Sequence, residues 1–187
     1  MKLVIISGNP KRDGLCESLE NAVEAGAREG GADVEIVRLC DMDIARCAVC
    51  GDGWGPCRAE HECIFGDDGF SDVNDTIAAA DAIAFVTPVY WWEVSEALKS
   101  FIDRFRRCNF GTEGRLSGKP VLMAVSAGGT GNGILKCLTQ LESFCTHTGA
   151  VVFDFIGQNR WNSDYKREAA FAAAKALAQG RKPGDTV

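Results

Sequence analysis

The alternation of apolar and polar runs along the chain predicts five strands. Residues 2–7 (KLVIIS) and 82–88 (AIAFVTP) are continuous apolar runs, as expected of strands that are buried on both faces of a parallel sheet. The pattern repeats at 120–127 (PVLMAVSA) and 150–157 (AVVFDFIG). Residues 33–39 (DVEIVRL) mix charged and apolar positions, which favours an edge strand.

Between these runs, apolar residues recur at the spacing of one helical face. The expected helices cover residues 15–29, about 71–80 with Ser71 as the cap, Val94 to Phe105, Ile134 to Cys145, and about 164–179. Because the crossover between parallel strands is right-handed, strands that alternate with helices predict a three-layer, doubly wound α/β fold with a five-stranded parallel sheet. The length of 187 residues suits a single domain over 1–180, with a Cys-rich insertion at 47–63 and a C-terminal tail at 181–187.

The net charge, the N-terminal residues and the number of cysteines limit the partners and the cellular location that can be expected. The net charge of −6 argues against nucleic acid as a partner, because binding phosphate backbones needs a basic face. The N-terminal apolar run is too short for a signal peptide or a membrane span, so we expect a cytoplasmic protein with no membrane partner. An odd count of nine cysteines then favours reduced thiols over disulfides.

Doubly wound folds bind ligands beyond the carboxyl ends of their strands, so the loops after the first, third and fourth strands are informative. The first loop, SGNPKRDGLCESL, lacks G-x-G-x-x-G and also G-x-x-x-x-G-K-S/T. Backbone amides at the start of the following helix, with Lys11 or Arg12, could hold one phosphate monoester. The alternative for this loop is a surface turn with solvated basic side chains.

The loop after the third strand carries a family resemblance. TPVYWWEVSEALKSFIDR at 87–104 resembles the signature of the flavodoxin-like NAD(P)H-dependent FMN reductases, and SAGGTGNG at 126–133 resembles their third flavin-contacting loop. The resemblance covers residues 1 to about 155. It implies a flavodoxin-like strand order 2-1-3-4-5, bound FMN, NAD(P)H as co-substrate, and subunits that pair as a homodimer or homotetramer.

The resemblance also implies the residues that contact the cofactor. The phosphate-loop positions are Asn9, Lys11, Gly14, Leu15 and Cys16, with Arg12 as an alternative cation. The isoalloxazine positions are Thr87, Pro88, Val89, Tyr90, Trp91 and Trp92, and the positions after the fourth strand are Ala127, Gly128 and Gly129. Relatives commonly have serine or threonine at positions 9 and 16 and glycine at position 92.

A flavin ring needs a flat aromatic or apolar wall and nearby backbone donors, which Tyr90, Trp91 and the glycine loop could supply. One of Trp91 and Trp92 is expected to pack against a helix or subunit instead, because adjacent residues rarely share one wall. Hydride would pass directly from nicotinamide to flavin, so we name no catalytic acid or base. Asp103 and Arg104 are interpreted as a structural ion pair or helix-end charges.

Four cysteines lie in CAVCGDGWGPCRAEHEC at 47–63, namely Cys47, Cys50, Cys57 and Cys63. The segment resembles the compact motif that iron-sulfur flavoproteins use for a [4Fe-4S] cluster. The spacing departs from that motif, because Gly53 holds the position of the third cysteine and the next cysteine is Cys57.

Several interpretations of this segment stay open. It could hold a cluster or a tetrahedral zinc ion, with His61 as a substitute ligand; it could be a metal-free loop lining the active site; or Cys47 and Cys50 could form a thiol pair. Trp54 and Phe65 would then pack the loop over the flavin or against a partner subunit. Cys137 and Cys145 are expected in the core, Asp67 and Asp68 at a helix start, and His147 at a helix end.

The resulting prediction is an FMN-dependent oxidoreductase that takes hydride from NAD(P)H and passes electrons to a quinone, a flavin, a nitro compound or a metal ion. The main alternative is an electron carrier with FMN and a [4Fe-4S] cluster that works with ferredoxin-type partners. A zinc-stabilised binding module without redox activity is a third class, and it predicts a colourless protein.

Overall fold

Five parallel strands form one sheet in the computed structural model, which describes residues 1–64, 68–110 and 114–182. The strands are β1 (Lys2–Ser7), β2 (Asp33–Arg38), β3 (Ala82–Pro88), β4 (Pro120–Ser126) and β5 (Val151–Gln158). Their order in the sheet is β2-β1-β3-β4-β5, and every neighbouring pair is parallel. The predicted fold class and strand order are confirmed.

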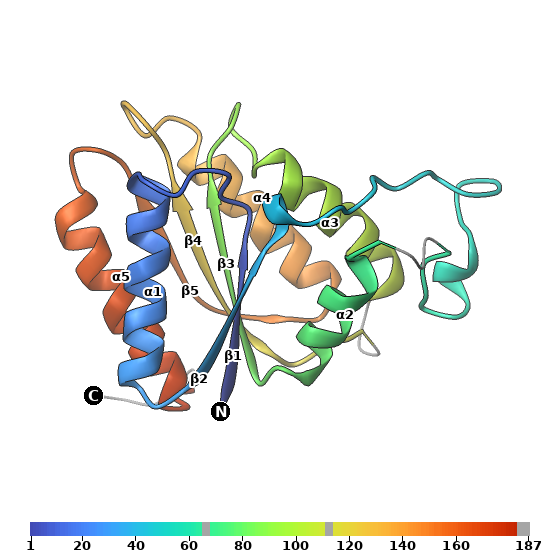
Figure 1. Cartoon of the computed structure of the whole chain (residues 1–187), viewed down its shortest axis with the longest axis horizontal. Coiled ribbons are helices and arrows are strands. Elements are labelled where there is room, and N and C mark those ends of the chain that lie inside the picture. The colour runs from blue at the N-terminus through green and yellow to red at the C-terminus, as the bar shows by residue number, and fades with distance from the viewer. Residues whose placement is uncertain (65–67, 111–113, 183–187) are drawn as a thin grey trace.

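Helices cover both faces of the sheet (Figure 1). They are α1 (Leu15–Glu29), α2 (Phe70–Ala79), α3 (Glu96–Cys108), α4 (Ile134–His147) and α5 (Ser163–Ala178). Alternate β1 residues enter two separate cores: Leu3 and Ile5 pack with α1 and α5, whereas Val4 and Ile6 pack with α2, α3 and α4. The two-residue period of the strands thus produces the three-layer arrangement.

Two local features differ from expectation. Ser71 is not the cap of α2, because the helix begins one residue earlier and the amide of Phe70 donates to Asp68 Oδ1 at 3.2 Å. The strand β5 is less buried than its apolar sequence suggests, with Val151 and Phe155 exposed. It lies at one edge of the sheet, where the outer side has no neighbouring strand among the described residues.

Because all strands are parallel, their carboxyl ends meet at one rim, drawn at the top of Figure 1. The Cys-rich segment starts near this rim after the short helix η1 (Leu39–Asp41), runs outward along α3, and contains the short helix η2 (Pro56–Arg58). In the described part of the chain, no helix is long and apolar enough to cross a bilayer.

Candidate functional site

Three loops form the rim: residues 8–14 after β1, 89–95 after β3 and 127–133 after β4. The first loop is fixed to β3 at Gly8, whose amide donates to the carbonyl of Val86 at 2.8 Å, and Gly8 also lies against Ser95 of the second loop. A Cβ at Gly8 would clash with Ser95 Oγ and lie 2.8 Å from Leu98 Cβ. Glycine at this position therefore lets the phosphate-loop backbone approach the start of α3.

Asn9 shapes the first loop from inside. The side chain is buried, its Oδ1 accepts from the amide of Lys11 at 3.2 Å, and its Nδ2 donates to the carbonyl of Lys11 at 2.5 Å. The side-chain amide of Asn9 is therefore occupied by hydrogen bonds within the loop. The donors left at this end of α1 are the backbone amides of its first turn, which have no partner inside the helix. Gly14 occupies the N-cap position there, followed by Leu15 and Cys16.

The two basic side chains of this loop lie at the surface. Lys11 Nζ is 3.2 Å from Asp13 Oδ1, and Arg12 pairs with Asp41 of η1. Cys16 differs from both, because its thiol is buried in the core against α5 and the sheet, and burial raises its pKa well above the ordinary value. Only the backbone of Cys16 is placed to serve the loop.

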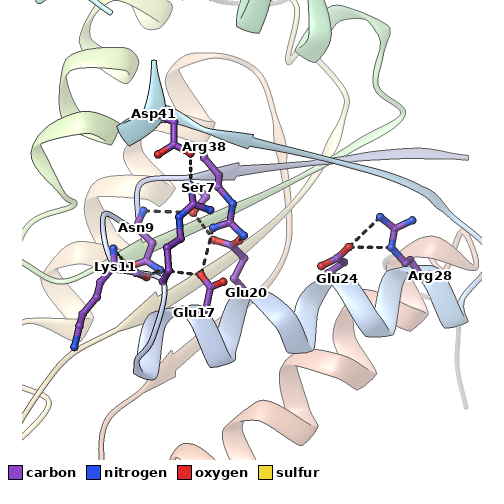
Figure 2. A network of polar contacts seen from close by, with 10 residues as sticks. Ser7, Asn9, Lys11, Glu17, Glu20, Glu24, Arg28, Arg38 and Asp41 are labelled. Atoms are coloured by element: carbon purple, nitrogen blue, oxygen red, sulfur yellow. Dashed lines mark hydrogen bonds and ion pairs between the residues drawn. The ribbon is translucent and has the colours of Figure 1, made fainter. Parts of the chain in front are cut away.

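A buried acidic network lies beneath the first loop (Figure 2). Glu20 of α1 is fully buried, accepts from the Ser7 hydroxyl, and lies 2.5 Å from Arg38 Nη2. Burial raises the pKa of Glu20, while Ser7 and Arg38 oppose that shift. Arg38 Nη1 also lies 3.3 Å from Glu17 Oε2, which accepts from Asn9 Nδ2 at the same distance. The network ties the edge strand β2 to the phosphate loop.

The second loop contains a tight turn of two tryptophans. Tyr90 and Glu93 exchange backbone hydrogen bonds of 2.9 and 3.0 Å, and Trp91 and Trp92 between them both have positive φ, at 49° and 75°. This is the geometry of a type I′ turn, which glycine and asparagine normally occupy. Trp91 is 94% exposed and Trp92 is 45% exposed. The turn thus holds one indole outward at the rim despite backbone strain.

The third loop is shaped by glycine. Gly133 has φ of 91°, and a Cβ there would lie 2.8 Å from Trp92 Cα, so the second and third loops pack backbone to backbone. A Cβ added at Gly128 or Gly129 would meet nothing within 4 Å. The backbone at these two residues is therefore open to a flat ligand.

Thr87 and Gln158 brace the rim from below. Thr87 Oγ1 accepts from the amide of Ser95 at 3.0 Å, which closes the base of the second loop. Gln158, at the end of β5, donates to the carbonyl of Leu15 and to Ser126 Oγ at 3.2 Å. Glu20, Ser95 and Gln158 could not be recognised from the sequence, since each looks like an ordinary helix, cap or strand-end residue.

Hollows flank the tryptophan turn on both sides. One of about 410 Å³ runs between Pro10 of the first loop, Cys40 of η1 and Tyr90. Another of about 560 Å³ lies between Trp91, Trp92 and Lys136 of α4, where Lys136 Nζ is 4.3 Å from the centre of the Trp92 ring. Both volumes are in the range of small-molecule sites.

The residues of the rim fit a flavin mononucleotide. A helix N-terminus with adjacent cations suits a phosphate monoester, and a bare glycine backbone opposite aromatic side chains suits a planar ring. The predicted phosphate residues lie in the first loop and the first turn of α1, and the predicted ring residues lie at the end of β3 and in the two following loops. The close approaches at Gly8 and Gly133 show that the three loops are in direct contact.

The four cysteines of the insertion border one small cavity, and a fifth cysteine from α3 joins them; we call it the thiol cavity, lined by Cys47, Cys50, Cys57, Cys63 and Cys108. Arg104 and Arg107 of α3 lie in the same lining. Arg104 is buried, pairs with Asp68, and donates to Cys63 Sγ at 3.3 Å and to the carbonyl of Ala45 at 2.9 Å.

Asp103 and Arg104 have structural roles, as expected, but they do not pair with each other: Asp103 pairs with Lys99 and Arg106. Trp54 lies against Phe110 and under the guanidinium of Arg107, so it packs the insertion onto the end of α3 instead of over the rim. Phe65 and Asp67 lie outside the described residues.

The cysteine side chains that line the thiol cavity are all sulfur donors, the type that iron-sulfur clusters and zinc both use. Among residues 1–64, 68–110 and 114–182, no three cysteine, histidine or carboxylate side chains are placed to hold one metal ion. A cluster separates its thiolates over several irons, and here all the motif thiols reach one cavity. The cavity holds about 20 Å³, so the insertion would have to open to admit a cluster.

The sheet order and the three glycine-containing rim loops define a flavodoxin-like α/β protein. The particular family is established by sequence. Residues 1–160 match the model of the NADPH-dependent FMN reductase family, so the chain belongs to that family. This confirms the predicted relationship to the flavodoxin-like FMN reductases.

Two curated relatives belong to the iron-sulfur branch. The chain is 32% identical over 136 residues to an iron-sulfur flavoprotein of Methanosarcina thermophila, covering 71% of this chain and 66% of that protein. It is 30% identical over 199 residues to an iron-sulfur flavoprotein of Archaeoglobus fulgidus, covering 96% of this chain and 92% of that protein. A further match spans only 45% of a second A. fulgidus iron-sulfur flavoprotein.

The fold has counterparts among solved structures. The crystal structure of RosB with bound 8-demethyl-8-formylriboflavin-5'-phosphate superposes with a TM-score of 0.76 at 15% identity, covering 96% of this chain and 79% of RosB. At this identity the likeness establishes the fold alone.

Proposed function

We propose that the chain binds FMN at the rim and acts as an oxidoreductase that takes electrons from NAD(P)H and delivers them to a second acceptor. The observation that carries the proposal is the contact of all three rim loops through Gly8 and Gly133 at the carboxyl edge of the sheet. Family membership supports it independently. The acceptor class is a quinone, a free flavin, a nitro compound or a metal ion.

The phosphate would be held by the backbone amides of Gly14, Leu15 and Cys16, with the Lys11 and Arg12 side chains at the surface of the loop. Asn9 would act through its hydrogen bonds to Lys11, which fix the shape of the loop. A phosphate would compete with Asp13 and Asp41 for the two cations.

The ring would be held by the segment Thr87 to Trp92 and by Ala127, Gly128 and Gly129. Bound FMN supplies the redox chemistry, because it accepts hydride from nicotinamide and returns electrons to an acceptor. The described residues of the rim bind, orient and cover the ring, so no side chain is assigned as a general acid or base. The proposed assembly is a homodimer or homotetramer.

The direct test is the visible spectrum of the freshly purified protein. A flavin band at about 450 nm that NADPH or NADH bleaches under anaerobic conditions is expected. Comparison of the two bleaching rates gives the nicotinamide preference, and reoxidation by single acceptors identifies the acceptor class. A colourless folded protein that cannot be reloaded with FMN would reject the proposal in favour of a binding module.

A second candidate function is an FMN and iron-sulfur electron carrier with a ferredoxin-type partner. The thiol cavity favours it, because the four motif cysteines converge although their spacing departs from the family motif. Arg104 and Arg107 would compensate the negative charge of a thiolate-bound centre. Iron and acid-labile sulfide in stoichiometric amounts after anaerobic purification would support the carrier, and their absence would leave the NAD(P)H-dependent function alone.

A further inference from the structure

The motif in the sequence supplies four thiols, but the structure brings five to the thiol cavity. The additional thiol belongs to Cys108, the last residue of α3. It lies 45 positions after Cys63, the last cysteine of the motif. Sequence spacing alone cannot reveal such a residue, because the contact depends on how the insertion folds back onto the helix.

The C-terminal half of α3 holds the insertion at several points. Arg104 binds the carbonyl of Ala45 before the motif and Cys63 Sγ at its end. Arg107 donates to the carbonyl of Gly53 in the middle, and His61 Nδ1 lies 2.8 Å from the carbonyl of Cys108. The helix is therefore one wall of the thiol cavity and not a distant neighbour.

Burial alone would make Cys108 a small core residue, since it extends the buried face of α3 formed by Leu98, Phe101, Ile102 and Phe105. Its surroundings differ from those of a core cysteine. Cys137 and Cys145 are buried in α4 away from the thiol cavity, whereas Cys108 lines the cavity together with Cys57 and Cys63.

The motif lacks one cysteine at position 53, and Cys108 could supply the missing thiol. Where the related motif has its third cysteine, this chain has a glycine with φ of 102°, and the next thiol, Cys57, lies in η2. We propose that Cys108 is a thiolate ligand of the iron-sulfur centre, supplied by α3 in place of one motif cysteine. This inference rests on the second candidate function, and Cys57 is the motif cysteine expected to be dispensable.

The test is anaerobic reconstitution with ferrous iron and sulfide, followed by desalting and measurement of iron and acid-labile sulfide per folded protein. Cys108→Ala and Cys108→Ser are compared with Cys145→Ala, a matched control that is equally buried but outside the cavity. Loss of most iron and sulfide in both Cys108 variants, with the control at the wild-type level, is the expected result. Wild-type iron and sulfide in the Cys108 variants would overturn the proposal.

The four motif variants, each cysteine to serine, provide a second measurement that does not depend on folding of a Cys108 variant. If Cys108 is a ligand, one of the four keeps the cluster. If all four lose it, the motif supplies every ligand and the proposal is wrong. A wild-type protein that takes up neither iron nor sulfide overturns the centre and the role of Cys108 together, whereas FMN content, measured on the same samples, tests the rim separately.

Discussion

A buried charge at a single position, Arg104, holds the insertion to α3. Arg104 is nearly inaccessible to solvent, yet it binds a carboxylate, a thiol and a backbone carbonyl from segments on both sides of the insertion. A buried arginine is tolerated only with such partners, because an uncompensated buried charge is costly. Asp68 is a charged partner of Arg104, so this pair is a sensitive point for both the stability of the protein and the geometry of the thiol cavity.

Asp68→Asn is expected to lower the free energy of unfolding by about 3 kcal/mol at neutral pH, because it removes the charge opposite Arg104. Burial opposes ionisation of Asp68, but hydrogen bonds from Arg104 and from the amide of Ala45 outweigh it and lower its pKa below 3.8. The wild type therefore loses this contribution as pH falls below 3.8, and the difference between the two proteins should shrink there. Urea unfolding at a series of pH values measures it.

Asp72→Asn is the matched control, because Asp72 is an exposed aspartate in the first turn of α2, close in sequence to Asp68. Its effect should stay below about 1 kcal/mol. An Asp68→Asn protein as stable as the wild type at neutral pH would contradict the assigned role of the Arg104 pair.

Gly8 is a second residue at which a small change should have a large effect. Gly8→Ala places a methyl group against Ser95 Oγ and Leu98 Cβ, so we expect a loss of about 1–3 kcal/mol from overpacking and weaker FMN retention as the first two loops separate. Gly128→Ala, which meets nothing within 4 Å, should leave the free energy of unfolding unchanged. Equal stability of the two variants in urea unfolding would show that the loops are not tightly packed.

At the scale of elements, the tryptophan turn stores strain that a substitution can release. Trp91→Asn puts a residue that tolerates positive φ at the first position of the type I′ turn and loses little packing, since Trp91 is 94% exposed. A gain of about 1 kcal/mol in the unfolding free energy without FMN is expected, whereas Trp91→Ala, which keeps the unfavourable φ, should gain less. Thermal unfolding of the apo-proteins compares them; a less stable Trp91→Asn protein would contradict the strain.

The elements themselves were predictable, because their signals are local. The apolar runs of β1, β3 and β4 and the helical spacing of α1 and α3 gave boundaries that differ from the structure by a few residues. The start of α2 was misplaced because its N-cap is Gly69, whose side chain cannot cap, and the amide of Phe70 instead donates to Asp68, which also pairs with Arg104. The exposure of β5 follows from its place at the sheet edge, which depends on strand order and not on its own sequence.

The site was predictable only in part, because several of its contacts join residues that lie far apart in the sequence. Residues of the rim loops could be named from their sequence resemblance, although their role as FMN contacts stays a prediction. The brace at Gln158 joins residues 143 positions apart, and the contact of Cys108 with the insertion depends on the packing of α3. The division into one domain with an insertion at 47–63 and a tail at 181–187 also stays a prediction.

At the scale of the whole molecule, the rim joins loops from three strands, so a ligand bound there should stabilise the entire fold. FMN at about 100 times its dissociation constant should add about 2.7 kcal/mol to the free energy of unfolding, which corresponds to a rise of roughly 5–10 °C in Tm for a chain of this size.

Lys11→Ala combined with Arg12→Ala should reduce this shift in Tm, because both cations lie at the proposed phosphate position. Lys175→Ala, which removes an exposed cation paired with Glu29 at the far end of α1, should keep the full shift. An undiminished shift in the double variant would place the phosphate elsewhere, and the absence of any shift in the wild type would remove FMN from the rim.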